Sequence, residues 1–145
     1  MSSSAAIDVL GELLVIHFRS FPQYLAATHA WMERSEDEAV EVIRNIVADQ
    51  QTYCTRLADM IQRRGGRIDQ GDFPMDYTDT HDLGLDFIIG KLLREQKRDL
   101  ELIENCRSRL AADVPGTVLA EEALGAAQAH LDALEELESS RMATS

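Results

Sequence analysis

Four polar residues occupy positions where the spacing of the apolar residues would place a buried side chain. They are His17, Gln50, Glu95 and His130, and each is near the middle of a predicted helix. Polar side chains that converge at mid-height in a four-helix bundle can hold an internal metal site. Metal binding is therefore the chemistry that these residues would support. The alternative is a buried polar network in which neighbouring groups satisfy one another by hydrogen bonds.

A site for a single ion would combine two imidazoles with a carboxylate, from His17, His130 and Glu95. This set of ligands suits iron, zinc or manganese. Asp99 lies one helical turn from Glu95 and could be a further ligand, or could orient one. The sequence thus predicts a possible divalent-metal site, with iron as one candidate.

Gln50 and Tyr53, on the second predicted helix, could complete the same site as ligands or as hydrogen-bond donors. A tyrosine beside a metal can be redox-active, whereas a core tyrosine usually has only its hydroxyl bonded. Cys54 and Cys106 lie on or beside apolar stripes, so we expect buried, unreactive thiols. No nucleophile with an evident base stands out.

The candidate residues lie on four segments with an apolar residue every three or four positions, which is the period of an amphipathic helix. The first segment covers residues 7–33, and Pro22 is expected to kink it. The second follows a helix cap at Ser35 and ends at Gly65-Gly66. The third and fourth are separated by the break at residues 113–116. The sequence therefore predicts an all-α fold.

One domain of four helices is expected over residues 7–138. At 145 residues the chain is long enough for one domain with a sound core. Residues 1–6 are expected to be a disordered N-terminal tail, and residues 139–145 a frayed C-terminal tail.

The lengths of the links predict the topology. Short links join the first helix to the second and the third to the fourth, whereas a turn-rich link covers residues 65–80. A helix of about 28 residues is ~42 Å long, and about sixteen extended residues reach ~50 Å. The long link can therefore cross the whole bundle, which would make the second and third helices parallel. The order short, long, short is that of the ferritin-like bundle.

Several segments resemble proteins of the ferritin-like superfamily. The chain resembles Dps-type mini-ferritins at Leu10–Leu14, His29–Trp31 and Leu57–Gly66, and bacterioferritin and rubrerythrin at Gln23-Tyr24 and Ala129–Glu135. The resemblance implies a four-helix bundle with one long crossover. It also implies iron binding or storage, with ferroxidase-type activity where the metal site is intact.

The resemblance also implies where an in-bundle di-iron site would lie. Such a site uses one Glu on each of two helices and a Glu-x-x-His motif on each of the other two. These positions correspond here to His17, Gln50–Tyr53, Glu95 and Ala127–His130. Only Glu95 and His130 retain a ligand of the family, so we do not expect a standard di-iron centre.

Dps-type proteins instead bind metal between subunits, with ligands from the first two helices. His29, Glu41 and Asp59 correspond loosely to those ligands, and Thr55 lies near the position of an intervening Asp. This second site is therefore also incomplete.

The charge of the chain restricts its partners. Acidic residues outnumber lysine and arginine by 26 to 14, which gives a net charge of −12. Nucleic acids and anionic membranes are bound through clustered cations, so we expect neither as a partner. The resemblance implies a homo-oligomer, for which Trp31 or Phe73 could be an anchor. The few cysteines and the lack of a signal-like N-terminus lead us to expect a cytoplasmic protein.

Two hypotheses about function follow. The first is a ferritin-like protein with an atypical or lost metal centre, which binds or stores iron. The second is a metal-free bundle that acts as a structural or protein-interaction module.

Overall fold

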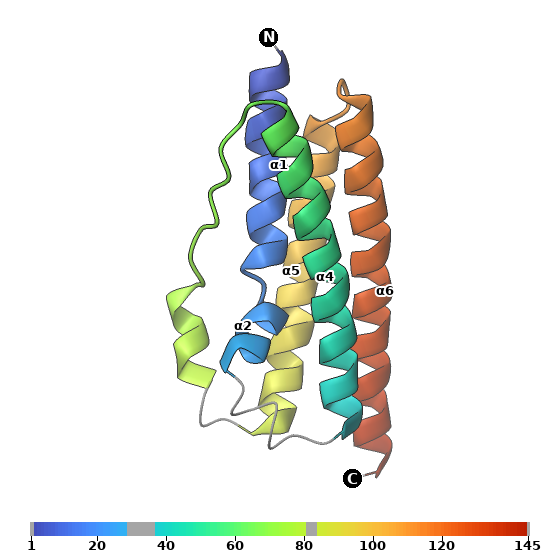
Figure 1. Cartoon of the computed structure of the whole chain (residues 1–145). Helices are drawn as coiled ribbons and strands as arrows, with labels where there is room; N and C mark the ends of the chain where they lie inside the picture. The colour runs from blue at the N-terminus through green and yellow to red at the C-terminus, as the bar shows by residue number, and fades with distance from the viewer. Residues whose placement is uncertain (1, 29–36, 81–83, 145) are drawn as a thin grey trace.

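The computed structural model describes residues 2–28, 37–80 and 84–144. These residues form a bundle of long helices (Figure 1). The elements are α1 (Ser2–Phe18), α2 (Phe21–Thr28), α4 (Asp37–Arg63), the 3-10 helix η1 (Met75–Thr80), α5 (Leu85–Arg109) and α6 (Val114–Thr144). No helix in this described part is long and apolar enough to cross a membrane.

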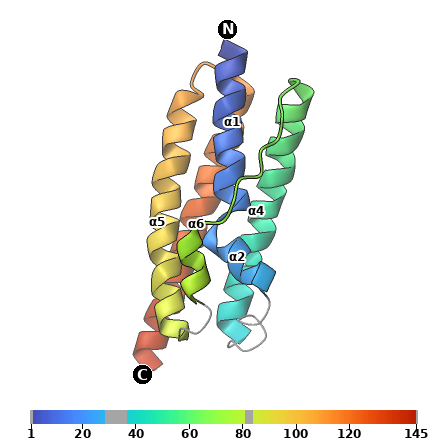
Figure 2. The same cartoon turned by 90° about the vertical axis from the view of Figure 1, so that its left-hand side faces the viewer.

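The long link between α4 and α5 returns along the whole length of the bundle (Figures 1 and 2). As a result α5 runs parallel to α4 and antiparallel to α1, and α6 runs antiparallel to α5. Helix α1 packs mainly against α4 and α5, and α6 packs against the same two helices from the other side. The predicted crossover topology is therefore confirmed.

The first predicted helix is broken rather than kinked. Helix α1 ends at Phe18, and α2 begins at Phe21. The Ser20 hydroxyl accepts a hydrogen bond from the backbone N–H of Gln23, as an N-cap does. Pro22 then lies in the first turn of α2, where its missing N–H costs nothing. The break brings Ser20 and Gln23 into the interior, where both are buried.

Helix α4 ends in a glycine turn that starts the crossover. Gly65 has a φ of 77°, a left-handed conformation that glycine adopts without steric cost. The N–H of Gly66 donates to the carbonyl of Ile61, and that of Gly65 to the carbonyl of Gln62. These two bonds are those of a Schellman motif, which satisfies the last carbonyls of the helix.

The helices extend further into both tails than we expected. Helix α1 begins at Ser2, and Ala6 is buried in the core, so residues 2–6 are not a disordered tail in this structure. At the other end, α6 continues to Thr144, and Arg141 donates to Asp86 of α5. Core packing at one end and an interhelical ion pair at the other explain why the helices extend into both tails.

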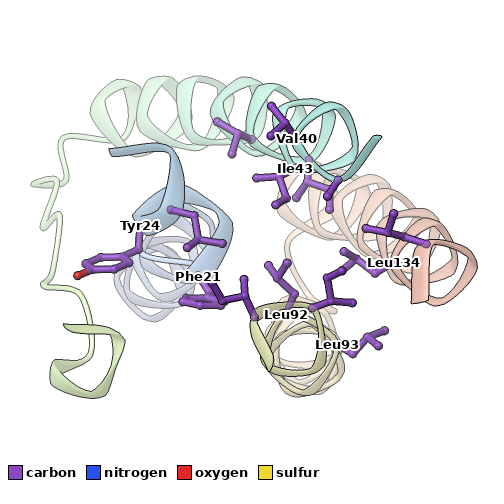
Figure 3. Packing of buried hydrophobic residues seen from close by; sticks show 14 of the residues in the cluster. Phe21, Tyr24, Val40, Ile43, Leu92, Leu93 and Leu134 are labelled. Carbon is purple, nitrogen blue, oxygen red and sulfur yellow. The ribbon is translucent and has the colours of Figure 1, made fainter. Parts of the chain in front are cut away.

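The core consists of two apolar clusters separated by buried polar side chains. One cluster lies around Phe21, Leu92 and Leu134 (Figure 3), and the other around Leu10 and Leu57. Helices α4, α5 and α6 each contribute to both clusters, one with each half. Helix α1 contributes to the second cluster and α2, which follows it, to the first. We call the buried polar residues at this level the polar layer: His17, Ser20, Gln23, Gln50, Gln96 and His130.

Aromatic side chains hold the crossover against the bundle. Phe73 and Tyr77 of the crossover pack against Tyr24 of α2, with ring centroids 5.3 and 5.6 Å away from the Tyr24 ring. Lys91 of α5 donates to Asp76 of η1 at 2.8 Å. Part of the Phe73 ring is therefore packed within its own chain, and its role as an anchor for another copy stays a prediction. Trp31, the other expected anchor, lies outside the described residues.

Candidate functional site

A small cavity lies at the level of the polar layer and is lined by α1, α4, α5 and α6. Its volume is about 10 Å³, room for roughly one water molecule or one small ion. Five of the six residues predicted to form a metal site line this central cavity: His17, Gln50, Tyr53, Asp99 and His130. The structure therefore brings residues of all four helices together around one cavity, and their binding of a metal stays a prediction.

The exception is Glu95, which does not line the central cavity. Its carboxylate accepts a hydrogen bond of 3.1 Å from the Tyr77 hydroxyl, and Lys91 Nζ lies 3.9 Å from it. Glu95 thus faces the crossover, and Gln96 lines the cavity in its place. Residues one position apart on a helix differ by about 100° in direction, so this shift moves the side chain off the core face. The α5 residue at this point of the cavity is therefore an amide, where the sequence predicted a carboxylate.

His17 is held in a neutral form. Its Nδ1 lies 2.8 Å from the carbonyl oxygen of Leu13, so this nitrogen must carry the proton. Burial lowers the pKa of His17, the Leu13 bond opposes the change, and the nearby His130 lowers the pKa further. The ring packs beside Tyr53, with centroids 5.8 Å apart. The neutral imidazole leaves Nε2 as its one acceptor.

Gln50 is the acceptor in a buried network. Its side-chain oxygen accepts from the Ser20 hydroxyl at 2.8 Å and from Gln23 Nε2 at 3.2 Å. Gln23 Nε2 also donates to the carbonyl oxygen of Val47. The network joins α4 to the break between α1 and α2. The oxygen that could have faced a metal is therefore already bonded twice.

Gln96 makes the corresponding link between α5 and α6. Its Nε2 donates to the carbonyl oxygen of Ala127 at 2.9 Å, and the Gln96 side chain is buried. Ala127, where the family pattern has a glutamate, supplies only its backbone oxygen. An amide and a backbone carbonyl thus satisfy one another where α5 and α6 meet at the cavity.

His130 and Tyr53, the two other polar cavity residues on α4 and α6, form hydrogen bonds with residues nearer the surface. His130 Nε2 lies 2.8 Å from the carboxylate of Asp49, an exposed residue of α4. The Tyr53 hydroxyl donates to the carbonyl oxygen of Glu122, which fits a tyrosine with its hydroxyl bonded. Both contacts tie α4 to α6 at the level of the cavity.

Asp99 is the one carboxylate that lines the central cavity among the described residues. The pKa of this carboxyl is raised to about 7, chiefly by burial and also by the nearby charge of Glu95, while Arg98 opposes the change. Asp99 is therefore half-protonated near neutral pH. A carboxyl that titrates at this cavity would make the stability of the bundle depend on pH.

The residues around the cavity do not fit the metal centre that the fold family implies. Two adjacent cations need several carboxylates, and the described residues offer only Asp99. Nor do any three His, Cys, Asp or Glu side chains in the described ranges lie close enough to hold a single ion. The amides of Gln50 and Gln96 are engaged in hydrogen bonds within the protein. The donor set is that of a satisfied polar network.

The residues that correspond to the Dps-type site are not brought together at a described centre. Glu41 is exposed on α4, and Asp59 pairs with Arg63 of the same helix. Thr55 donates its hydroxyl to the carbonyl of Gln51. His29 lies outside the described residues.

Three members of the polar layer were not expected from the sequence: Ser20, Gln23 and Gln96. Serine is a typical helix cap and Pro22 follows Ser20 by two residues, so this signal could have revealed the break and hence the burial of Ser20. Gln96 follows Leu93 by three residues and precedes Leu100 by four, which is the spacing of the core face. The stripe of Leu85, Ile89 and Leu92 leads instead to Glu95, which is the residue that the sequence predicts.

The cysteines do not add a reactive group to the site. Cys106 is buried and Cys54 half-buried, and both are free thiols. Burial raises the pKa of each thiol to about 11, which keeps it protonated at neutral pH. Both thiols therefore lack the thiolate that reactivity requires.

Comparison with known proteins gives a structural match without close sequence similarity. No family model matches the chain, and no curated protein matches it significantly. The structure is similar to that of Rhodobacter capsulatus bacterioferritin, with a TM-score of 0.80, 16% identity, and coverage of 94% of this chain and 84% of that chain. That bacterioferritin was described with a metal-free dinuclear site and with haem iron in a crystallographic special position. This chain therefore has the ferritin-like four-helix bundle fold.

Proposed function

We propose that this protein is a ferritin-like bundle in which hydrogen-bonded side chains have replaced the intra-bundle metal centre. It acts as a non-catalytic structural subunit that associates with further copies of itself. The observation that carries this proposal is the bonding of Gln50, whose side-chain oxygen accepts from both Ser20 and Gln23. A ligand at this position would have to give up two buried hydrogen bonds before it could bind an ion.

Physical chemistry supports a structural role for this layer. Buried polar groups that are fully bonded stabilise one packing arrangement, whereas partly bonded ones destabilise it. No buried side-chain nitrogen or oxygen atom in the described part of the chain lacks a partner. The polar layer thus stabilises the bundle without a metal.

Oxidation of iron tests this proposal directly. Fe(II) is added to the purified protein in air, and the ferric product is followed by absorbance, with a protein-free blank. We expect the blank and the protein to give the same rate. A rate that rises with protein concentration, and that is lost in both His17→Ala and His130→Ala, would contradict the proposal.

Iron storage without internal oxidation is the second candidate. The structural likeness to bacterioferritin supports it, and the net charge of −12 would concentrate cations near the protein. After iron loading and gel filtration, iron that elutes with an assembled protein would favour storage. Protein that elutes free of iron would argue against storage and favour the structural role.

A further inference from the structure

A surface groove lies away from the polar layer, between the C-terminal part of α4 and the N-terminal part of α6. Its volume is about 570 Å³. Met60 and Leu119 contribute apolar surface to it, and Val114 and Val118 border it from the first turns of α6. Arg56, Arg63 and Arg64 line its α4 side. We call this surface the α4–α6 groove.

Two valines expose unusual apolar area at this groove. Val114 is 70% exposed and Val118 is 50% exposed. They are four residues apart on one helix, so their side chains lie on the same face. Leu119, the next residue, is buried. Protruding apolar side chains and an apolar groove therefore lie side by side in one patch. A two-fold contact between identical copies needs this self-complementary arrangement.

The charges of the groove are paired within the chain. Arg56 bonds to Glu122, Arg63 to Asp59 and Arg64 to Asp113, each with one N–O distance of 3.0 Å. A nucleic acid or an anionic ligand needs unpaired cations, so the paired arginines do not favour either one.

The overall charge favours a second copy at this surface. Two chains that each carry −12 repel one another over their acidic surfaces. This repulsion is weakest at a surface where acidic and basic side chains balance one another, as the paired arginines and carboxylates of the α4–α6 groove do. Apolar area surrounded by paired charges is the usual composition of a contact between proteins.

We propose that the α4–α6 groove is a contact between two copies of this chain. Val118 of each copy lies in the groove of the other, beside Met60 and Leu119. The proposal rests on the self-association included in the proposed function, and it does not depend on the state of the metal site.

The test measures the mass of the protein in solution by light scattering and sedimentation over a range of concentrations. Val118→Glu and Val118→Lys place opposite charges in the contact, and both residues are good helix formers. Phe87→Glu and Phe87→Lys are the matched controls, because Phe87 is 51% exposed at the start of α5. Circular dichroism and thermal melting establish that each variant is folded.

We expect the wild type to associate and both Val118 variants to raise the apparent Kd by at least about tenfold, because either charge would be buried in an apolar contact. The Phe87 variants should associate as the wild type does. Weaker association for Glu but stronger for Lys at both positions would show a general charge effect and overturn the proposal. If the wild type associates and the Val118 variants have the same apparent Kd, the proposed contact is wrong, although self-association itself would stand. A monomeric wild type would overturn the self-association as well, whatever the iron assay shows.

Discussion

The side-chain amide of Gln96 donates to the backbone oxygen of Ala127, 2.9 Å away, across the interface of α5 and α6. A di-iron bundle would present carboxylates from its facing helices at this level. Here an amide and a backbone carbonyl satisfy one another, and no charge needs to be balanced by a cation. This contact, with the bonds to Gln50, supports our proposal that the middle of the bundle is a structural layer.

Loss of the Gln50 acceptor should destabilise the protein. Gln50→Leu preserves most of the volume but leaves the buried Ser20 hydroxyl and Gln23 amide with fewer acceptors. We expect the free energy of unfolding to fall by about 1–3 kcal/mol, measured by urea denaturation. Gln51→Leu is the control, since Gln51 is exposed on the same helix, and should change stability by less than about 0.5 kcal/mol. Equal effects at the two positions would argue against a buried network.

The titration of Asp99 should make stability fall as pH rises. Its pKa is raised to about 7 in the folded protein, chiefly by burial, from 3.8. Between these values the folded state binds more protons than the unfolded state, so stability decreases with rising pH. Asp99→Asn cannot ionise, so its stability should not fall in this way. Above about pH 7 it should be more stable than the wild type by on the order of 2–4 kcal/mol.

The comparison of Asp99→Asn with the wild type uses thermal and urea unfolding from about pH 4 to about pH 8. The difference between the two proteins should grow through this range and then level off. A difference that does not change with pH would show that Asp99 does not titrate there.

Different parts of the structure could be predicted to different extents. The crossover was predicted from the link length together with the family resemblance, because a chain of that length can span the bundle and a short one cannot. The levels of His17, Gln50 and His130 followed from helical period. The choice between Glu95 and Gln96 did not, since Leu92 and Leu93 are both buried and allow either register. The bonds of Ser20 and Gln23 depend on a helix break whose position is set by tertiary packing.

Asp113 should stabilise the start of α6 in two separable ways. One carboxylate oxygen accepts from the backbone N–H of Gly116, and the carboxylate also pairs with Arg64. Asp113→Asn should retain the helix cap and lose the ion pair, and Asp113→Ala should lose both. We expect Asp113→Ala to be less stable than Asp113→Asn by about 1 kcal/mol, measured by urea denaturation. Equal stability of the two variants would mean that the cap contributes nothing.

The pH dependence of Asp113 has the opposite sign to that of Asp99. The bond to Arg64 is the main cause that lowers the pKa of Asp113, while burial opposes it. The ion pair therefore stabilises the protein above the unfolded pKa of the carboxyl, near 4, and the stability is lost as pH falls. The advantage of the wild type over Asp113→Asn should shrink below about pH 4.

Restoring the family's ligands at the cavity should create metal binding. The variant combines five substitutions: His17→Glu, Gln50→Glu, Tyr53→His, Gln96→Glu and Ala127→Glu. With His130 these supply the two glutamates and two Glu-x-x-His motifs of a di-iron bundle. Without metal the buried carboxylates repel, so this variant should melt below the wild type. Added divalent metal should raise its melting temperature.

The matched control for this variant restores the same ligands but retains Ala127. It lacks one carboxylate and should bind metal more weakly, as measured by metal analysis after gel filtration. A folded five-residue variant that binds no more metal than the wild type would contradict our assignment of the cavity positions, above all that of Gln96 in place of Glu95.

The melting temperature of the wild-type protein with and without Fe(II), Mn(II) or Zn(II) tests the central claim most directly. A ligand that binds only the folded state raises the melting temperature with its concentration. If the polar layer has replaced the metal centre, metal should leave the melting temperature unchanged, while His130→Ala lowers it equally with and without metal by the loss of the Asp49 bond. A melting temperature that rises with metal in the wild type, but not in His17→Ala or His130→Ala, would contradict the claim.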